Sequence, residues 1–128
     1  MTFSQQMMGS YPLTAEGVAR HVTTGRPGAY ALGFTTGDLF TVQFVGRADE
    51  NLAEALAAHA AARRYAKFKA LPLPSAHDAF ERECDLFHQF GGLRHLDNTA
   101  HPARPSAASW KCPHCTIYGI GDWSAAAR

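Results

Sequence analysis

Cysteines and histidines in the second half of the chain have the spacing of a metal site. Cys84 and His88 are four residues apart on an expected helix, so both side chains project from one face. Cys112 and Cys115 form a Cys-x-x-Cys pair further along the chain. Three thiolates and one imidazole are a usual ligand set for structural zinc. The spacing therefore predicts a zinc ion held by Cys84, His88, Cys112 and Cys115, which would tie the end of the chain to the helix.

Other interpretations of these residues stay open. Three further histidines could replace His88 as the nitrogen ligand: His95, His101 and His114. Cys84 could instead be a buried free thiol beside an unrelated Cys-x-x-Cys pair. A redox pair is disfavoured because no thioredoxin-like strand–helix–strand pattern surrounds it, and haem attachment is disfavoured because that motif has its histidine after the second cysteine.

A second set of side chains lies on two expected strands joined by a turn at Gly37. Residues 30–34 and 40–44 alternate in side-chain size or polarity, as strands do. A register symmetric about Gly37 pairs Tyr30 with Phe44 and keeps the large side chains on one face. Two aromatic rings held side by side, with Arg47 close by, predict a site that faces a phosphate.

These residues resemble the motifs of the GIY-YIG nuclease family. Gly28-Ala29-Tyr30 corresponds to the first motif and Phe44-Val45-Gly46 to the second. The resemblance covers roughly residues 27–98. It implies an α+β fold with a small three-stranded sheet flanked by helices, and a metal-dependent endonuclease that hydrolyses phosphodiester bonds of DNA.

The resemblance also assigns catalytic roles by position. Tyr30 would act on the attacking water, and Glu83 would hold a divalent Mg²⁺ or Mn²⁺ ion. Asn98 corresponds to a supporting asparagine, Arg47 to the basic position after the second motif, and His59 to a histidine on the first long helix. Taken alone, each has a plainer interpretation: Tyr30 as a half-buried strand residue, Glu83 as a solvated helix carboxylate, Asn98 as a turn residue and His59 as a surface histidine.

Two positions depart from the family pattern. Phe44 lacks the hydroxyl of the second-motif tyrosine, and Ala55 stands where the family has an arginine. A guanidinium at the scissile phosphate would stabilise the transition state by about 3–4 kcal/mol. Arg63 lies about 12 Å further along the same helix, beyond easy reach, so Arg47 is the better substitute. The chain is therefore expected to be a weak or inactive nuclease.

Basic residues predict a nucleic-acid partner. Five of them could line a phosphate-binding surface: Arg47, Arg63, Arg64, Lys67 and Lys69. Their alternative is an ordinary solvated helix end and strand face. Two other functions remain open: a nucleic-acid-binding module without catalysis, and a protein-interaction or inhibitor protein on a nuclease scaffold.

The remaining pattern predicts the elements that position these residues. Residues 1–13 are expected to be loose, with a short helix capped by Thr14 after them. Asp49 is expected to cap a helix over residues 50–64, and residues 65–71 should form a third strand. Ser75 opens a capping box and a second long helix, to about residue 90.

Bulk composition limits the class of protein. The 128 residues, 46% of them hydrophobic, predict one domain, with a core over residues 27–98 and a zinc-tethered tail over 99–128. The net charge of +1 is uninformative alone. No apolar run approaches the roughly 20 residues of a membrane span, and no secretion signal is evident at the start. The odd number of cysteines suits a reducing cytoplasm better than a disulfide framework.

Overall fold

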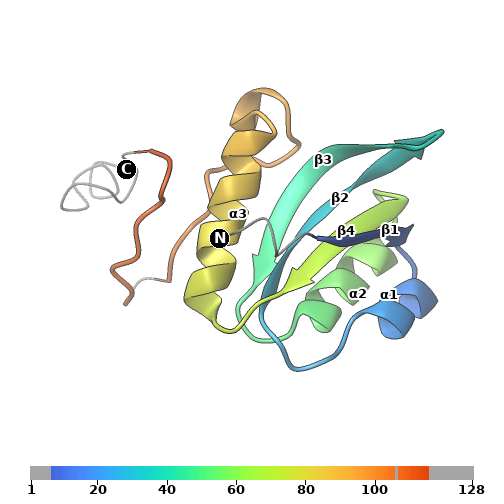
Figure 1. The fold of residues 1–128 in the computed structure, drawn as a ribbon, viewed down its shortest axis with the longest axis horizontal. Coiled ribbons are helices and arrows are strands. Elements are labelled where there is room, and N and C mark those ends of the chain that lie inside the picture. The colour runs from blue at the N-terminus through green and yellow to red at the C-terminus, as the bar shows by residue number, and fades with distance from the viewer. Residues whose placement is uncertain (1–6, 106, 116–128) are drawn as a thin grey trace.

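A computed structural model of the chain describes residues 7–105 and 107–115 (Figure 1). In chain order the elements are β1 (Met8–Pro12), α1 (Ala15–His21), β2 (Gly28–Thr36), β3 (Leu39–Ala48), α2 (Leu52–Ala62), β4 (Lys67–Pro72), α3 (Ala76–Gln89) and the short 3-10 helix η2 (Gly92–Arg94). Figure 1 shows α3 on one face of the sheet and α1 and α2 on the other. The predicted α+β class is confirmed.

The sheet has four strands in the order β1-β4-β2-β3, with every neighbouring pair antiparallel. The prediction of three strands was therefore wrong, because part of the supposedly loose N-terminal stretch is a strand. β1 pairs along the edge of β4, and the Tyr11 ring packs edge-on against Phe68 at 5.7 Å. A five-residue strand containing a glycine and ending in a proline has no clear period-two pattern, so only this pairing reveals it.

The β2–β3 hairpin has a different register from the one predicted. Tyr30 lies opposite Gly46, and Phe44 lies opposite Leu32. The shift arises at a bulge, where the partner changes from Phe44 at Leu32 to Val42 at Gly33. Since the partner of Tyr30 moves by two residues, Tyr30 and Phe44 still share one face, as expected from the side-chain period of two.

The caps of the helices are partly as predicted. Thr14 caps α1 through Gly17 N at 2.9 Å, and Ser75 caps α3 through Asp78 N at 3.1 Å. The prediction that Asp49 caps α2 was wrong. Asn51 is the cap, because its Oδ1 accepts hydrogen bonds from Glu54 N and Gly25 N, both at 3.2 Å.

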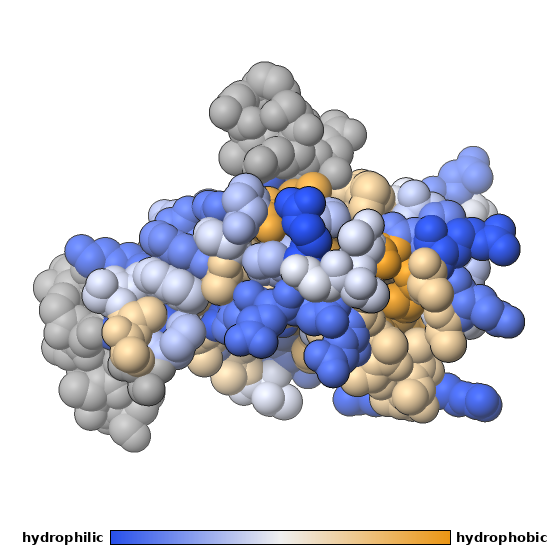
Figure 2. Space-filling model, turned by 90° about the horizontal axis from the view of Figure 1, so that it is seen from below, coloured by the Kyte–Doolittle hydropathy of each residue, from blue (hydrophilic) through white to orange (hydrophobic). Residues whose placement is uncertain are grey.

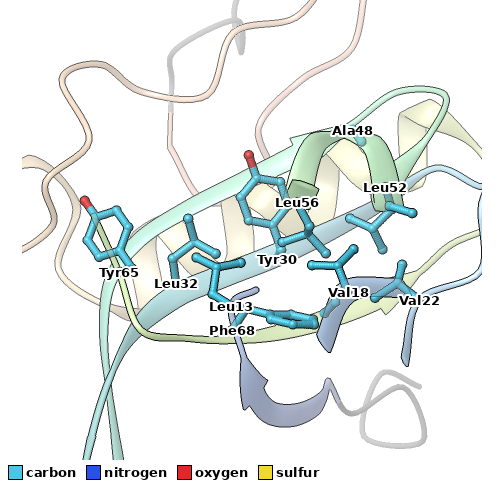
Figure 3. Close-up of a cluster of buried hydrophobic side chains, with 12 residues drawn as sticks. Leu13, Val18, Val22, Tyr30, Leu32, Ala48, Leu52, Leu56, Tyr65 and Phe68 are labelled. Atoms are coloured by element: carbon cyan, nitrogen blue, oxygen red, sulfur yellow. The ribbon is translucent and has the colours of Figure 1, made fainter. Parts of the chain in front are cut away.

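Each face of the sheet has its own hydrophobic core. Figure 3 shows the cluster beneath α1 and α2, where Leu52 and Leu56 of α2 pack over Leu32 and Phe68 of the sheet. The Tyr30 ring belongs to this cluster, with its hydroxyl pointing away from the hydrophobic side chains (Figure 3). On the other face, α3 covers a second cluster that includes residues of β2, β3 and β4.

The tail runs along α3 on the side away from the sheet (Figure 1). Trp110 packs against Phe80 of α3 at a ring distance of 5.6 Å, and Cys112 is buried in the same cluster. The surface seen from below in Figure 2 is mostly polar, with hydrophobic residues in small patches between charged ones. In the part of the chain that the structure describes, no helix is long and apolar enough to cross a membrane.

Candidate functional site

A groove of about 300 Å³ opens where β2, β3 and α3 meet, and several of the predicted catalytic residues line it. Tyr30, Arg47, Glu83 and Asn98 all contribute to its walls, although Glu83 and Asn98 lie at least 35 residues from the hairpin in sequence. Phe44 lines it as well. The structure thus brings together residues that were grouped only by resemblance.

Tyr30 reaches the groove because its neighbour across the hairpin has no side chain. A Cβ atom added to Gly46 would lie 2.5 Å from Tyr30 Cζ and closer still to the hydroxyl oxygen. The tyrosine ring therefore lies across the Gly46 backbone and projects its hydroxyl into the groove. The lack of a side chain at Gly46 therefore shapes the groove, although the sequence indicates this residue only as part of a motif.

The Tyr30 hydroxyl is paired with His59, a contact between β2 and α2. The hydroxyl and His59 Nε2 are 2.9 Å apart, and the two rings meet edge to face at 5.3 Å. Burial lowers the pKa of His59, helped by the nearby Arg64 charge, so the imidazole is neutral at pH 7. Burial, and then the Glu83 charge, raise the pKa of Tyr30 well above its ordinary range. At neutral pH the pair is a phenol next to a neutral imidazole that can accept its proton.

Arg47 links two carboxylates in the groove. Its Nη1 donates to Glu83 Oε1 at 2.8 Å, and its Nε donates to Asp49 Oδ1 at 2.7 Å. Glu83 is only 8% exposed, and burial raises its pKa, although the Arg47 hydrogen bond opposes that shift. Glu83 is therefore a buried, paired carboxylate rather than a solvated one. The sequence pattern predicted Asp49 only as a helix cap and did not indicate that its carboxylate contacts Arg47 in the groove.

Asn98 holds the edge of the sheet rather than presenting a free amide. Its Oδ1 accepts from Val45 N at 3.0 Å, and its Nδ2 donates to Val45 O at 2.8 Å. The neighbouring Asp97 N donates to Gln43 O at 2.6 Å. Residues 97 and 98 thus act as a short extra pairing along β3, and Asn98 positions the strand that carries Arg47.

The two departures from the family pattern lie beside the groove. The Phe44 ring packs against His59 at 5.4 Å and supplies no polar atom to the groove it lines. Ala55 is one helical turn before His59 on α2, so a longer side chain there would project toward Tyr30. Of the described side chains that line the groove, only Arg47 is cationic, and it is already bound to two carboxylates.

The charge of the groove favours a divalent cation. Its ionised side chains are one guanidinium and two carboxylates, a sum of −1 from Arg47, Asp49 and Glu83. Glu83 has acceptor capacity left after its hydrogen bond to Arg47, since a carboxylate can accept about four hydrogen bonds. This fits the way Mg²⁺ binds, through one or two carboxylates with water and substrate phosphate.

A second candidate site lies between α3 and the tail. Four ligand atoms, from His88, His101, Cys112 and Cys115, all lie within 4.8 Å of one another. The His88 and His101 Nε2 atoms are 3.3 Å apart, and each imidazole Nε2 lies 3.4 Å from one cysteine Sγ. Bond lengths of tetrahedral zinc imply separations of about 3.4–3.8 Å between such atoms. This cluster could hold a metal ion.

The surroundings of the cluster also suit a metal. His101 Nδ1 lies 2.8 Å from Pro102 O, a contact that places the ring proton on Nδ1, so that Nε2 carries the lone pair that can bind a metal. Burial lowers the pKa of both His88 and His101, which keeps the rings in their neutral, ligating form. The amide of His114 donates to Cys112 Sγ at 3.4 Å.

Three of the four predicted ligands are in this cluster, and Cys84 is not. Cys84 is fully buried against Cys112 and Phe80, and burial followed by the Cys112 sulfur raises the pKa of its thiol. His101 takes its place among the four. The sequence indicates His101 only as a substitute for His88, because its position depends on how the irregular tail folds back rather than on a local pattern.

The predicted nucleic-acid-binding set does not form one surface. Arg47 lies in the groove with Glu83, whereas Arg63 and Arg64 line a different groove at the end of α2. Lys67 and Lys69 alternate with buried Phe68 and so face the α3 side of β4, where Lys69 Nζ lies over the Phe40 ring at 5.4 Å.

Comparison with known proteins assigns no family: no family model, curated protein or solved structure matches the chain.

Proposed function

We propose that the chain is a metal-dependent phosphodiesterase domain of GIY-YIG type that acts on DNA, with its chemistry weakened by Ala55 and Phe44. The proposal depends on one observation: Tyr30 and Glu83 line the same groove, and His59 lies within hydrogen-bond distance of the Tyr30 hydroxyl. These residues come from β2, α2 and α3, so no local pattern groups them. Hydrolysis of a phosphodiester needs a group that removes a proton from the attacking water, which Tyr30 and His59 can provide, and a carboxylate that can hold a metal, which Glu83 can provide.

In this mechanism the protein orients the water and moves its proton. The Tyr30 hydroxyl donates to neutral His59, and its oxygen then accepts a hydrogen bond from the attacking water. As the water attacks phosphorus, its proton passes to Tyr30 while the Tyr30 proton passes to His59. A divalent cation held by Glu83, water and phosphate oxygens would supply Lewis-acid stabilisation of the developing charge.

Arg47 and Asp49 then have a positioning role. Arg47 holds the Glu83 carboxylate at 2.8 Å, and Asp49 holds Arg47 in turn at 2.7 Å. Because the guanidinium already satisfies two carboxylates, it is a poor replacement for the arginine that the family has at position 55. The unmodified chain is therefore a weak catalyst.

The test is a plasmid-nicking assay with added Mg²⁺ or Mn²⁺. Ala55→Arg should raise the cleavage rate by about 100- to 1000-fold, since it restores a transition-state donor. Ala19→Arg adds the same charge on the exposed face of α1 and should leave the rate unchanged. Robust cleavage by the unmodified chain would contradict the weakened state, and a folded Ala55→Arg variant without any gain would contradict the site.

We also propose that the cluster of His88, His101, Cys112 and Cys115 holds a structural zinc ion. The separations of its ligand atoms support a tetrahedral site, and all four positions are filled by protein, which is typical of structural rather than catalytic zinc. The ion would anchor the tail on α3, the helix that also presents Glu83 to the groove.

Binding without catalysis is the second candidate function. The missing arginine at position 55 favours loss of catalysis, and DNA would then be held by basic side chains outside the negatively charged Glu83 groove, such as Arg63 and Arg64. Salt-dependent binding of DNA without cleavage by either the unmodified chain or Ala55→Arg would support this alternative.

A further inference from the structure

A larger groove of about 700 Å³ lies between the start of α1 and the end of α2. Its walls are mainly alanine methyl groups and the two aromatic rings of Phe34 and Tyr65, with Arg63 and Arg64 at the helix end. Phe34 is 43% exposed, which is unusual for a large aromatic side chain, whereas Tyr65 is buried. The groove therefore offers an exposed ring over an apolar floor.

The charge of this groove is positive. Among the described residues that line it, two are arginines and none is a carboxylate. Within residues 7–105 and 107–115, neither Arg63 nor Arg64 forms an ion pair, and the Arg64 guanidinium lies over the Tyr65 ring at 5.6 Å. A groove with two arginines and no acidic lining selects an anionic ligand.

A continuous row of aromatic rings connects this groove to the Glu83 groove. Phe34 contacts Tyr65 at 6.0 Å, and Tyr65 contacts Phe44 at 6.1 Å. Phe44 then contacts His59, which binds the Tyr30 hydroxyl. The two grooves thus meet at the contact between Tyr65, which lines this groove, and Phe44, which lines the Glu83 groove. A ligand that crosses this contact would enter both.

We propose that this groove binds an unpaired stretch of nucleic acid next to the phosphate in the Glu83 groove. One base would stack on Phe34, and the neighbouring phosphates would meet Arg63 and Arg64. Stacking on an exposed aromatic ring combined with arginine contacts is the usual way that proteins hold single strands. The proposal rests on the proposed nuclease function only for the orientation of the strand.

The distance between the grooves favours a chain of nucleotides over a mononucleotide. Tyr30 and Phe34 are four residues apart on β2, about 13 Å along a strand. A ligand that reaches both must extend over that length. Duplex ends would present paired, stacked bases, whose faces are not free to pack on Phe34. The groove therefore selects single-stranded or unpaired segments.

Fluorescence anisotropy with a labelled single-stranded oligodeoxythymidine, and with a blunt duplex of equal length, tests the proposal without added Mg²⁺ or Mn²⁺. Phe34→Ala should weaken single-strand binding by about 5- to 150-fold, with Phe34→Trp retaining it. Arg63→Gln combined with Arg64→Gln should reduce the slope of log affinity against log salt by about 1.4. Arg26→Gln with Arg94→Gln removes the same charge from exposed positions outside both grooves and serves as the control.

Several results would overturn the proposal: no single-strand binding by the unmodified chain, undiminished binding by Phe34→Ala, or an equal loss in the control pair. Its failure is distinguishable from failure of the nuclease proposal. If Ala55→Arg cleaves DNA and Phe34→Ala does not weaken binding, the proposal for this groove fails and the nuclease proposal stands. If single-strand binding depends on Phe34 but no variant cleaves DNA, the proposal for this groove stands and the nuclease proposal fails.

Discussion

Substitution of Gly46 by alanine is the sharpest test of how the groove is built. The added Cβ would lie 2.5 Å from Tyr30 Cζ and 2.8 Å from Cε1. Ordinary contacts between such atoms begin near 3.4 Å, so the ring must move by about 1 Å. Tyr30 is 5% exposed and packed in the cluster beneath α2, so it has little room to do so.

Two effects determine how much Gly46→Ala lowers the free energy of unfolding. Overpacking a well-packed site usually costs about 1–3 kcal/mol. Moving the ring also weakens the hydrogen bond of 2.9 Å between Tyr30 and His59, worth about 1 kcal/mol. Gly46→Ala should therefore lower the free energy of unfolding by about 2–4 kcal/mol. In the Ala55→Arg background, a hydroxyl misplaced by about 1 Å should also lower the cleavage rate by about 100-fold.

A double-mutant cycle measured by urea unfolding separates this clash from a general effect of the substitution. In a Tyr30→Ala background the same Gly46→Ala change meets no ring and should be nearly neutral, which gives a coupling energy of about 2 kcal/mol or more. Equal destabilisation in both backgrounds, or none in either, would refute the account of Tyr30 crossing the Gly46 backbone.

Three further outcomes are expected. Metal analysis of protein purified without added zinc should find one zinc per chain for Cys84→Ser and none for Cys112→Ser; the same result for both would contradict the ligand set. Chelation should increase hydrogen exchange in residues 99–115 while the sheet stays protected, and uniform loss of protection would show that the ion supports the whole fold. Burial holds the pKa of His59 below its usual value of 6.5, and the neutral ring is the proton acceptor in the proposed mechanism. The rate of cleavage by Ala55→Arg should therefore be constant near pH 7 and fall as the pH drops below 6.5. His59→Gln should abolish that fall, and an unchanged profile would exclude His59.

The residues of the Glu83 groove and those of the His/Cys cluster differ in how far local structure determines their positions. Tyr30 and Glu83 each lie on a regular element, so the packing of β2 against α3 largely fixes the directions in which their side chains point. The predicted capping box at Ser75 also placed α3 correctly, because a cap depends on residues only three apart. His101 lies in a segment that contains prolines and has no regular structure, so only tertiary contacts determine which atoms its ring approaches.

The sequence by itself determined the hairpin, the caps at Thr14 and Ser75, the α+β class and the shared face of Tyr30 and Phe44. All of these depend on interactions within a few residues or on the strand period of two, which survives an even shift in register. Tertiary structure alone decided the pairing of Tyr30 with Gly46, the fourth strand, the Arg47–Glu83 contact and the choice of His101 over Cys84. Those features depend on segments far apart in sequence, whose packing against one another leaves no signature in the local pattern.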